Sequence, residues 1–378
     1  MNADVIIVGG GPGGSVAAAA AVQKGLKVLL LDRAEFPRDK VCGDAVAAHC
    51  FDLLRELGME PFTDPAFYKI DQFNIRGPRG ISLTFKLSES EQTASCIVPR
   101  YVFDNALFQF AIKSGAEFQK ASVASLIVEH GQVVGVKAKV GKQEAEFRAP
   151  VVIGADGAAS VVARDLNSRQ PREDRWAVAL RAYIDTEADL DRTIDFVFLD
   201  KIQPGYAWLF PIAKRRANIG VGMRSDFYKK QNKSLNEALD YYLSTPVVRK
   251  LIGSHTPENV KSWSLPIFSF ELKRVFNGAL LVGDAGGFVT PLAGAGIHTA
   301  VVTGLAAAEA AARALKTGDV SEHGLASYDA LWKAELAADM RRELAVHDVL
   351  AFIPGLIDAF LLAARAVPPL VPRLLGKI

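Results

Sequence analysis

Short apolar runs and a helical stretch alternate at the start of the chain. Residues 4–8 and 27–31 are two brief, almost wholly apolar runs, and the alanine-rich residues 15–24 lie between them. Apolar runs of this length predict strands that are buried on both faces, and the segment between them predicts a helix. The order strand, helix, strand is typical of a βαβ unit in a parallel sheet whose two faces are both covered.

The pattern changes after residue 73 and returns late in the chain. Residues 73–98 alternate polar and apolar positions around a Gly-Pro-Arg-Gly turn, which predicts hairpins. The next predicted elements are a helix at 101–114, strands at 117–120, 125–129, 133–140 and 151–154, a β-rich block at 177–223 and a helix at 235–243. A buried strand at 279–284 then precedes a long helix after Gly296. The N-terminal pattern therefore resumes after an antiparallel insertion.

A chain of 378 residues is too long for one ordinary hydrophobic core, so we expect two to three domains or one large domain with insertions. The predicted division is a discontinuous α/β domain (residues 1–72, 98–168 and 270–320), a β-sheet domain (73–97 and 169–269) and a C-terminal helical segment (321–378).

Composition excludes several classes of protein. Half of the residues are hydrophobic and 23% are charged, which excludes a globally disordered chain. The 44 Lys and Arg residues nearly balance the 42 Asp and Glu residues, so we expect no nucleic-acid partner. Cys42, Cys50 and Cys96 cannot form a disulfide scaffold, which favours a reducing compartment, and they lack metal-ligand spacing, which predicts no metal site.

The chain offers no segment that we would interpret as a membrane span or a signal peptide. The first strand pattern begins within the first few residues, and no stretch of about 18 apolar residues is free of charge and proline. We therefore expect a cytoplasmic protein. Residues 344–366 mix apolar and charged positions, which allows two interpretations. They form helices packed on the body of the protein, or an amphipathic surface that contacts a membrane peripherally.

A glycine-rich turn follows the first predicted strand. It has the spacing Gly9-x-Gly11-x-x-Gly14, and Asp32 ends the second strand. The first glycine permits the tight turn, the second lets the backbone approach a pyrophosphate, and the third permits close packing of helix and strand. A carboxylate at the end of the second strand can bind a ribose diol. The pattern predicts an adenine dinucleotide but leaves NAD and FAD open, and a turn in an ordinary βαβ unit is the simpler alternative.

Two later motifs favour FAD. Asp156-Gly157 follows the predicted strand at 151–154, and Gly283-Asp284 ends the strand that precedes Gly294 and Gly296. Each alone could be an ordinary corner between a strand and a helix. In this order, after the glycine motif, they resemble the large family of FAD enzymes that includes aromatic hydroxylases, flavin-dependent halogenases and geranylgeranyl reductases.

This resemblance implies a fold and roles for the motifs. The implied fold is α/β: a glutathione-reductase-like FAD-binding Rossmann domain with a β-sheet substrate domain and C-terminal helices. Asp284 would bind the ribityl chain, and the helix that begins near Gly296 would point its N-terminus at the flavin pyrimidine. A helix N-terminus stabilises the negative charge of reduced flavin.

Two further segments favour the geranylgeranyl reductase branch. Residues 36–44 resemble the reductase segment in which a Cys-Gly pair, here Cys42-Gly43, passes close to the flavin ring. Residues 205–211 resemble the reductase signature Tyr-x-Trp-x-Phe-Pro, and strand alternation places its three aromatic residues on one face. Without the family context, three aromatics on one face are more often ordinary core.

The other two branches fit less well. Halogenases carry a Trp-x-Trp-x-Ile-Pro pattern and a catalytic lysine near position 80, where this chain has Arg76 and Arg79 as its only basic residues. Aromatic hydroxylases usually have a histidine soon after the Gly-Asp-Ala motif, where this chain has Gly286-Gly287-Phe288.

The resemblance also implies a set of site residues. Those expected to bind FAD are Gly9, Gly11, Gly14, Asp32, Arg33, Cys42, Gly43, Ala45, Arg100, Val123, Asp156, Gly157, Gly283, Asp284, Gly294, Gly296 and Ile297. Those expected to bind substrate are Tyr206, Trp208, Phe210 and Pro211. Cys42 is also the candidate catalytic acid, with a simple spacer role for its backbone as the alternative.

The implied activity is the reduction of C=C bonds in a polyprenyl chain carried by a lipid, a diphosphate or a quinone. Reduced flavin would supply the hydride, and NAD(P)H or ferredoxin would visit transiently as electron donor, because only one dinucleotide motif is present. The alternative is an FAD-dependent monooxygenase or halogenase acting on a hydrophobic or aromatic substrate. A non-catalytic FAD-containing binding or redox-sensing module is a third possibility.

Overall fold

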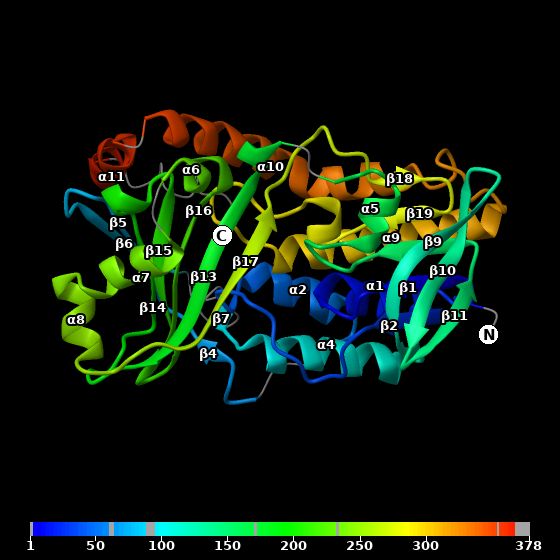
Figure 1. Ribbon diagram of the computed structural model, residues 1–378, viewed down its shortest axis with the longest axis horizontal. Coiled ribbons are helices and arrows are strands. Elements are labelled where there is room, and N and C mark those ends of the chain that lie inside the picture. Colours follow the sequence, from blue (N-terminus) through cyan, green and yellow to red (C-terminus); the bar gives the residue numbers. More distant parts are fainter. Residues whose placement is uncertain are drawn as a thin grey trace.

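A computed structural model describes residues 3–59, 64–87, 95–169, 172–231, 234–353 and 355–366. Figure 1 shows two sheet-based units side by side, with a long C-terminal helix crossing both.

The N-terminal unit is built on a six-stranded sheet. Its strand order is β18 (Val275–Phe276), β19 (Ala279–Leu281), β12 (Val151–Gly154), β1 (Val5–Val8), β2 (Val28–Asp32) and β8 (Glu117–Lys120). All neighbouring pairs are parallel except β18 with β19. The predicted βαβ unit is therefore confirmed, and the strand that follows residue 278 joins the same sheet.

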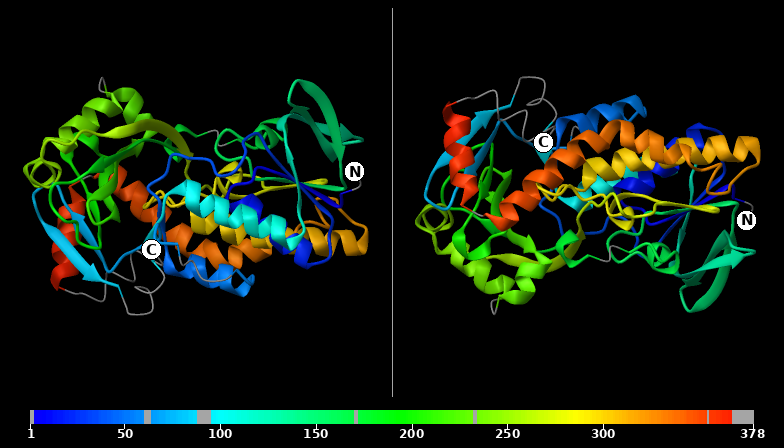
Figure 2. Two further views of the ribbon diagram at one scale, coloured as in Figure 1. Left: turned by 90° about the horizontal axis from the view of Figure 1, so that it is seen from below. Right: turned by 90° about the horizontal axis from the view of Figure 1, so that it is seen from above.

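Different layers cover the two faces of this sheet (Figure 2). Val5, Ile7 and Leu30 pack against helices α1 (Pro12–Gln23), α4 (Arg100–Ser114) and α9 (Ile297–Thr317). Ile6 and Leu29, on the opposite face, pack against a three-stranded sheet. That sheet consists of β9 (Ser122–Glu129), β10 (Gln132–Val140) and β11 (Gln143–Arg148).

The second unit is a seven-stranded sheet. Its order is β17 (Glu258–Pro266), β13 (Trp176–Asp185), β16 (Arg216–Arg224), β15 (Gly205–Ala213), β14 (Thr193–Val197), β5 (Gln72–Arg76) and β6 (Ser82–Lys86). Its outer face is covered by α7 (Leu235–Leu243) and α8 (Pro246–Ile252). Ala207 and Leu209 of β15 point to that covered face, while Tyr206, Trp208 and Phe210 join the cluster on the other face. The expected alternation along β15 is confirmed.

Shorter elements connect the two units. A small sheet joins β3 (Ala45–Val46), β7 (Cys96–Ile97) and β4 (Tyr68–Lys69), and α2 (Ala48–Glu56) follows β3. Helix α5 (Val161–Asp165) follows β12, and α6 (Ser225–Lys230) follows β16.

The C-terminal segment forms two helices. Helix α10 (Ser327–Phe352) packs along α9 and continues to the second sheet, and α11 (Leu356–Ala366) packs Ile357 and Leu361 against Ile75 of β5 (Figure 2). Among the described residues, no helix is both long and apolar enough to cross a membrane.

The observed elements differ from expectation mainly where the pattern is polar or short. Helix α7 matches its predicted bounds, and the Ser234–Glu237 capping box explains why it begins there. The sequence does not predict strand β17, because most of its residues are exposed and polar. The predicted strand at 279–284 is wrong in its last part, because it ends at Leu281 and a 3-10 turn follows at Gly283–Gly286. The α/β class with C-terminal helices is confirmed, whereas the glutathione-reductase-like subtype and the domain boundaries stay predictions.

Candidate functional site

A cavity of about 710 Å³ lies between the two units. Its walls include the residues that follow β1, β2, β12 and β19, where ligands bind in open α/β sheets. All of the expected FAD-binding residues except Gly14 line this one cavity, although they come from segments far apart in the sequence. The structure thus brings the predicted set together, and the role of each residue stays a prediction.

The glycine turn is shaped by close contacts. Gly9 has a φ of 103°, and a Cβ atom there would lie 2.4 Å from the carbonyl oxygen of Ala155. A Cβ atom on Gly14 would lie 1.8 Å from the carbonyl oxygen of Gly9. Gly14 therefore permits the packing of turn and helix rather than forming the cavity wall.

Three carboxylates stand at the edge of the cavity and have different partners. Asp32 accepts hydrogen bonds from the backbone N–H groups of Gly10 (2.7 Å) and Ala34 (2.8 Å). Asp156 accepts from the N–H group of Val161 (2.7 Å) at the start of α5, and burial raises its pKa. Asp284 instead pairs with the Nζ of Lys40 at 2.9 Å. Asp284 is therefore held by a long, flexible side chain, which can move aside more easily than backbone.

Two helix N-termini face the same cavity. Helix α1 begins after Gly11 and α9 begins after Gly296, and neither has a side-chain cap. The first N–H groups of a helix have no partner within the helix and carry partial positive charge. Both residues line the cavity, so it offers two places suited to anionic groups.

The segment before Cys42 is held by charge and aromatic contacts. Phe36 stacks on Phe108 of α4 with ring centroids 4.3 Å apart, and Arg38 pairs with Asp104 at 2.7 Å. Arg100 is buried and makes a bidentate pair with Asp104 at 2.6 and 2.8 Å. Burial opposes the charge of Arg100, but Asp104 and the Cys42 side chain outweigh it and raise the pKa of the guanidinium. Arg100 is therefore a positive charge held beside Cys42.

A buried polar cluster holds Cys42 and Gly43 from behind. The Nδ2 of Asn218 donates to the Cys42 carbonyl oxygen (2.7 Å) and to Oδ2 of Asp44 (2.8 Å), while Trp208 Nε1 donates to Asn218 Oδ1 (2.9 Å). The Tyr183 hydroxyl also donates to Oδ2 of Asp44, at 2.7 Å. Burial raises the pKa of Asp44 to about 6, although these hydrogen bonds oppose the shift. The Trp of the aromatic signature thus helps to position the Cys-Gly backbone.

Phe210 limits the space at Gly43. A Cβ atom on Gly43 would lie 2.9 Å from the Phe210 ring. A side chain at this position would displace the ring or the backbone, so the close approach of the loop to β15 requires glycine.

A second, apolar cavity of about 530 Å³ adjoins the first. Residues that line both are Phe73, Phe196, Phe198, Tyr206, Leu292, Ala293, Leu350 and Ile357. Its other walls come from β5, β6, α10 and α11. Of the expected substrate residues, Tyr206 lines both cavities and Trp208 and Phe210 line the first, whereas Pro211 is buried in β15 and belongs to neither wall.

Several residues in the wall of the first cavity are not among the predicted site residues, because no local sequence motif marks them. Arg181 of β13 is fully buried, and its Nε and Nη1 have no hydrogen-bond partner among the described residues. Lys261 and Trp263 of β17 also line the first cavity, as do Glu343 and His347 of α10. They reach the site from the edge strand and from the C-terminal segment, which only the tertiary fold brings to the cavity.

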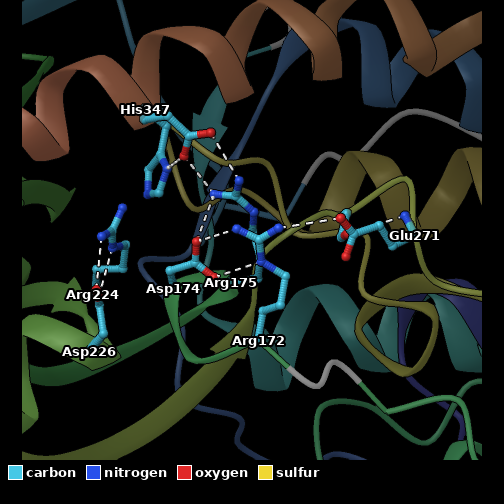
Figure 3. A network of polar contacts seen from close by, with 9 residues as sticks. Arg172, Asp174, Arg175, Arg224, Asp226, Glu271 and His347 are labelled. Carbon is cyan, nitrogen blue, oxygen red and sulfur yellow. Dashed lines mark hydrogen bonds and ion pairs between the residues drawn. The ribbon is translucent and has the colours of Figure 1, made fainter.

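Charged contacts attach α10 to the second unit beside the cavity (Figure 3). Arg175 makes a bidentate pair with Asp348 at 2.6 and 2.9 Å, and His347 Nδ1 lies 3.2 Å from Asp348. Burial lowers the pKa of His347. Arg224 pairs with Asp226 at 2.7 Å and faces the same region.

The described residues fit FAD. Gly11 leaves room at the N-terminus of α1, because a Cβ atom there would meet only the guanidinium of Arg38, at 3.5 Å. A Cβ atom on Gly157 would meet nothing within 4 Å among the described residues. Arg33, Arg38, Lys40 and Arg100 add positive charge along the wall. A cavity with two uncapped helix N-termini and several basic side chains in its wall suits a pyrophosphate and a flavin ring.

Comparison with known proteins defines the class. The model of the FAD binding domain family matches residues 2–340. The chain therefore belongs to this family of flavoproteins, within its geranylgeranyl reductase branch, and it is an FAD-dependent oxidoreductase.

The relatives are more particular. The chain is 34% identical to the digeranylgeranylglycerophospholipid reductase of Methanosphaerula palustris, over 87% of this chain and 81% of that one. It is 32% identical to digeranylgeranylglycerophospholipid reductase 2 of Methanopyrus kandleri, over 91% and 85%. The solved structure of a geranylgeranyl bacteriochlorophyll reductase-like protein from Thermoplasma acidophilum aligns with a TM-score of 0.86 and 26% identity, over 95% and 89%. A flavin-dependent brominase, at 24% identity and a TM-score of 0.82, shares the fold.

Asp284→Ala is expected to weaken the retention of FAD. The change removes a charge-assisted hydrogen-bond acceptor worth about 1.5–3 kcal/mol, or roughly 10- to 150-fold in the dissociation constant. Bound flavin is measured by absorbance after dialysis, with Asp240→Ala on the exposed face of α7 as control. Full flavin content in dialysed Asp284→Ala would contradict the assignment.

Proposed function

We propose that the protein reduces C=C bonds in the polyprenyl chains of an isoprenoid lipid. The observation that carries this proposal is the apolar cavity that continues from the predicted flavin site. Its walls are aromatic and aliphatic side chains with almost no polar surface, which suits a hydrocarbon chain. The relatives named as digeranylgeranylglycerophospholipid reductases support a glycerophospholipid as the carrier, ahead of a diphosphate or a quinone.

In this proposal, the first cavity holds FAD. The N-terminus of α1 and Arg33 bind the pyrophosphate and the adenosine half, together with Asp32 and Val123. Asp284 would bind the ribityl chain, and the N-terminus of α9 would stabilise negative charge on the flavin. Reduced flavin supplies a hydride when bound.

The protein's own residues then orient the substrate. The aromatic face of β15 and the residues shared by both cavities hold an alkene beside Cys42 and Gly43. The apolar side chains that α10 and α11 contribute to the wall of the second cavity shield the chain from water. NAD(P)H or ferredoxin is proposed to reduce the flavin during a transient visit, because the chain has one dinucleotide motif.

The alternative, oxygen-dependent halogenation or hydroxylation, finds less support at the relevant positions. Arg76 pairs with Asp195 at 3.0 Å, and Arg79 is largely exposed beside Asp358. Neither residue lines the first cavity, so neither is placed to act on a substrate beside the flavin.

Anaerobic incubation of the reduced protein with a geranylgeranylated glycerophospholipid is expected to add two hydrogen atoms per reduced bond. Mass spectrometry of the lipid detects the change. An oxygen-dependent product that carries a hydroxyl or halogen, with no anaerobic hydrogenation, would support the alternative. Bound flavin that no reductant can reduce would support a non-catalytic module.

Leu350→Trp is expected to impair long substrates selectively. Leu350 lines both cavities, so a larger side chain narrows their connection at a cost of about 1–3 kcal/mol, or roughly 5- to 150-fold in KM. KM is measured for geranyl- and geranylgeranyl-bearing substrates. Val247→Trp, on the exposed surface of α8, is the control. An equal increase in KM for both chain lengths would contradict the proposal that the polyprenyl chain passes Leu350.

The corner between α10 and α11 is proposed to contact a lipid bilayer peripherally. Phe352 is 82% exposed, and Val349, Ile353 and Leu362, which are close to it in the sequence, are at least half exposed. Val349 also lines the apolar cavity, so the exposed patch is continuous with the proposed path of the chain. A bilayer is the occupant that would present polyprenyl lipid at this patch.

Phe352→Ser is expected to reduce vesicle binding, because burial of a phenylalanine contributes about 1.5–3 kcal/mol. Cosedimentation with phosphatidylglycerol vesicles measures the bound fraction. Val128→Ser changes an exposed apolar residue on β9, and this variant is expected to bind vesicles like the unaltered protein. Equal losses in both variants would refute contact through this corner.

A further inference from the structure

Glu343 is a buried carboxyl group in the wall of the first cavity. It lies on α10, and its residue is 9% exposed. Its Oε2 accepts a hydrogen bond from the N–H group of Leu292 at 3.0 Å. Leu292 and Ala293 line both cavities, and so does Tyr206, whose hydroxyl donates to the Ala293 carbonyl oxygen. The carboxyl therefore lies beside the junction where the chain would meet the flavin.

The surroundings of this carboxyl favour its protonated form. Burial raises the pKa of Glu343 to about 7, although the N–H groups of the loop oppose the shift, and Asp339 on the preceding turn adds to the increase. Tyr206 faces it from β15, and His347 follows one turn later on α10, with Arg224 of β16 beyond. Near neutral pH a substantial share of the molecules thus holds a proton at this carboxyl.

The position of Glu343 is set from two sides. The Arg175–Asp348 pair attaches α10 to the second unit just beyond His347 (Figure 3), and the Leu292 N–H group holds the carboxyl itself. A proton donor must be held at a defined place against the substrate. If Glu343 only stabilised the loop at Leu292, its ionised form would be sufficient, because the carboxyl accepts the hydrogen bond from the Leu292 N–H group.

We propose that Glu343 is the acid that supplies the proton of alkene reduction, an inference that rests on the proposed function. The O–H bond of Glu343 breaks as a C–H bond forms at one alkene carbon, and the π pair of the C=C bond forms that bond. The other alkene carbon takes the hydride, so the substrate gains two hydrogen atoms and the flavin loses two electrons. The resulting carboxylate regains its proton from water.

This assignment competes with Cys42, which lines the same cavity. The Cys42 carbonyl oxygen accepts a hydrogen bond from Asn218 at 2.7 Å, which holds the Cys-Gly backbone in place. Cys42 also lies beside the Arg100 guanidinium. We therefore assign Cys42 the spacer role, in which the Cys42-Gly43 backbone meets the flavin ring.

The test is a single-turnover experiment with the FAD-loaded protein. The flavin is reduced with dithionite without oxygen, a geranylgeranylated glycerophospholipid is added, and reoxidation is followed by flavin absorbance between pH 5.5 and 9. Glu343→Gln keeps an oxygen that accepts from Leu292 but has no acid proton. Glu335→Gln, exposed on the same helix, is the matched control, and Cys42→Ala is run in parallel for its pH profile.

In the unaltered protein, flavin reoxidation is expected to slow as the pH rises through about 7, because the protonated form of Glu343 is lost. Glu343→Gln is expected to bind FAD and to reoxidise at least about 100-fold more slowly, as typical for loss of an acid catalyst. Its remaining rate should no longer fall near pH 7, whereas Glu335→Gln and Cys42→Ala should keep that fall.

Three results would overturn the assignment. One is a reoxidation rate that does not change with pH in the unaltered protein. The second is a rate in Glu343→Gln that falls with pH as it does in the unaltered protein. The third is loss of this pH-dependent fall in Cys42→Ala alone. The first of these does not require any variant to fold. If the unaltered protein yields no hydrogenated lipid by mass spectrometry, the proposed function itself fails, which separates that outcome from an error about Glu343.

Discussion

One buried amide, Asn218, connects the two halves of the site. It is fully buried, donates to the Cys42 carbonyl and the Asp44 carboxylate, and accepts from Trp208. A buried polar group left without its partner costs about 1–3 kcal/mol, so removing the amide would penalise several groups at once. The Cys-Gly segment belongs to the N-terminal half of the chain and Asn218 to the second sheet. The geometry of the first cavity therefore depends on this contact between the units.

The two cavities differ in chemistry because different elements form them. The first is bounded by the ends of parallel strands and by helix N-termini, which supply N–H groups, and by arginine and lysine side chains. The second is bounded by aromatic residues of β5, β6 and β14 and by apolar positions of α10 and α11. The cavity with charged groups in its wall and the apolar cavity thus meet at Tyr206, Leu292 and Leu350.

Helix α10 gives the C-terminal segment a part in the site. Its first half packs on α9, and its second half places Glu343, His347 and Leu350 in the cavity wall. The Arg175–Asp348 pair adds a specific attachment to the second unit. A segment without any recognisable motif therefore supplies both a titratable group and part of the apolar path.

The sequence alone determined the βαβ unit, the turn at Gly9, the alternation along β15 and the membership of a flavoprotein family. These features are local, because they depend on the spacing of glycines, apolar runs and aromatics within a few residues. Only the tertiary structure decided that Asn218 and Asp44 hold the Cys42 backbone, and that Glu343 faces the same cavity as Gly9. The Asn218 contacts join residues 174 and 176 positions apart, and the pattern at neither end shows the partner. The polar edge strand β17 and helix α10 carry their roles through packing against other elements, which no local periodicity encodes.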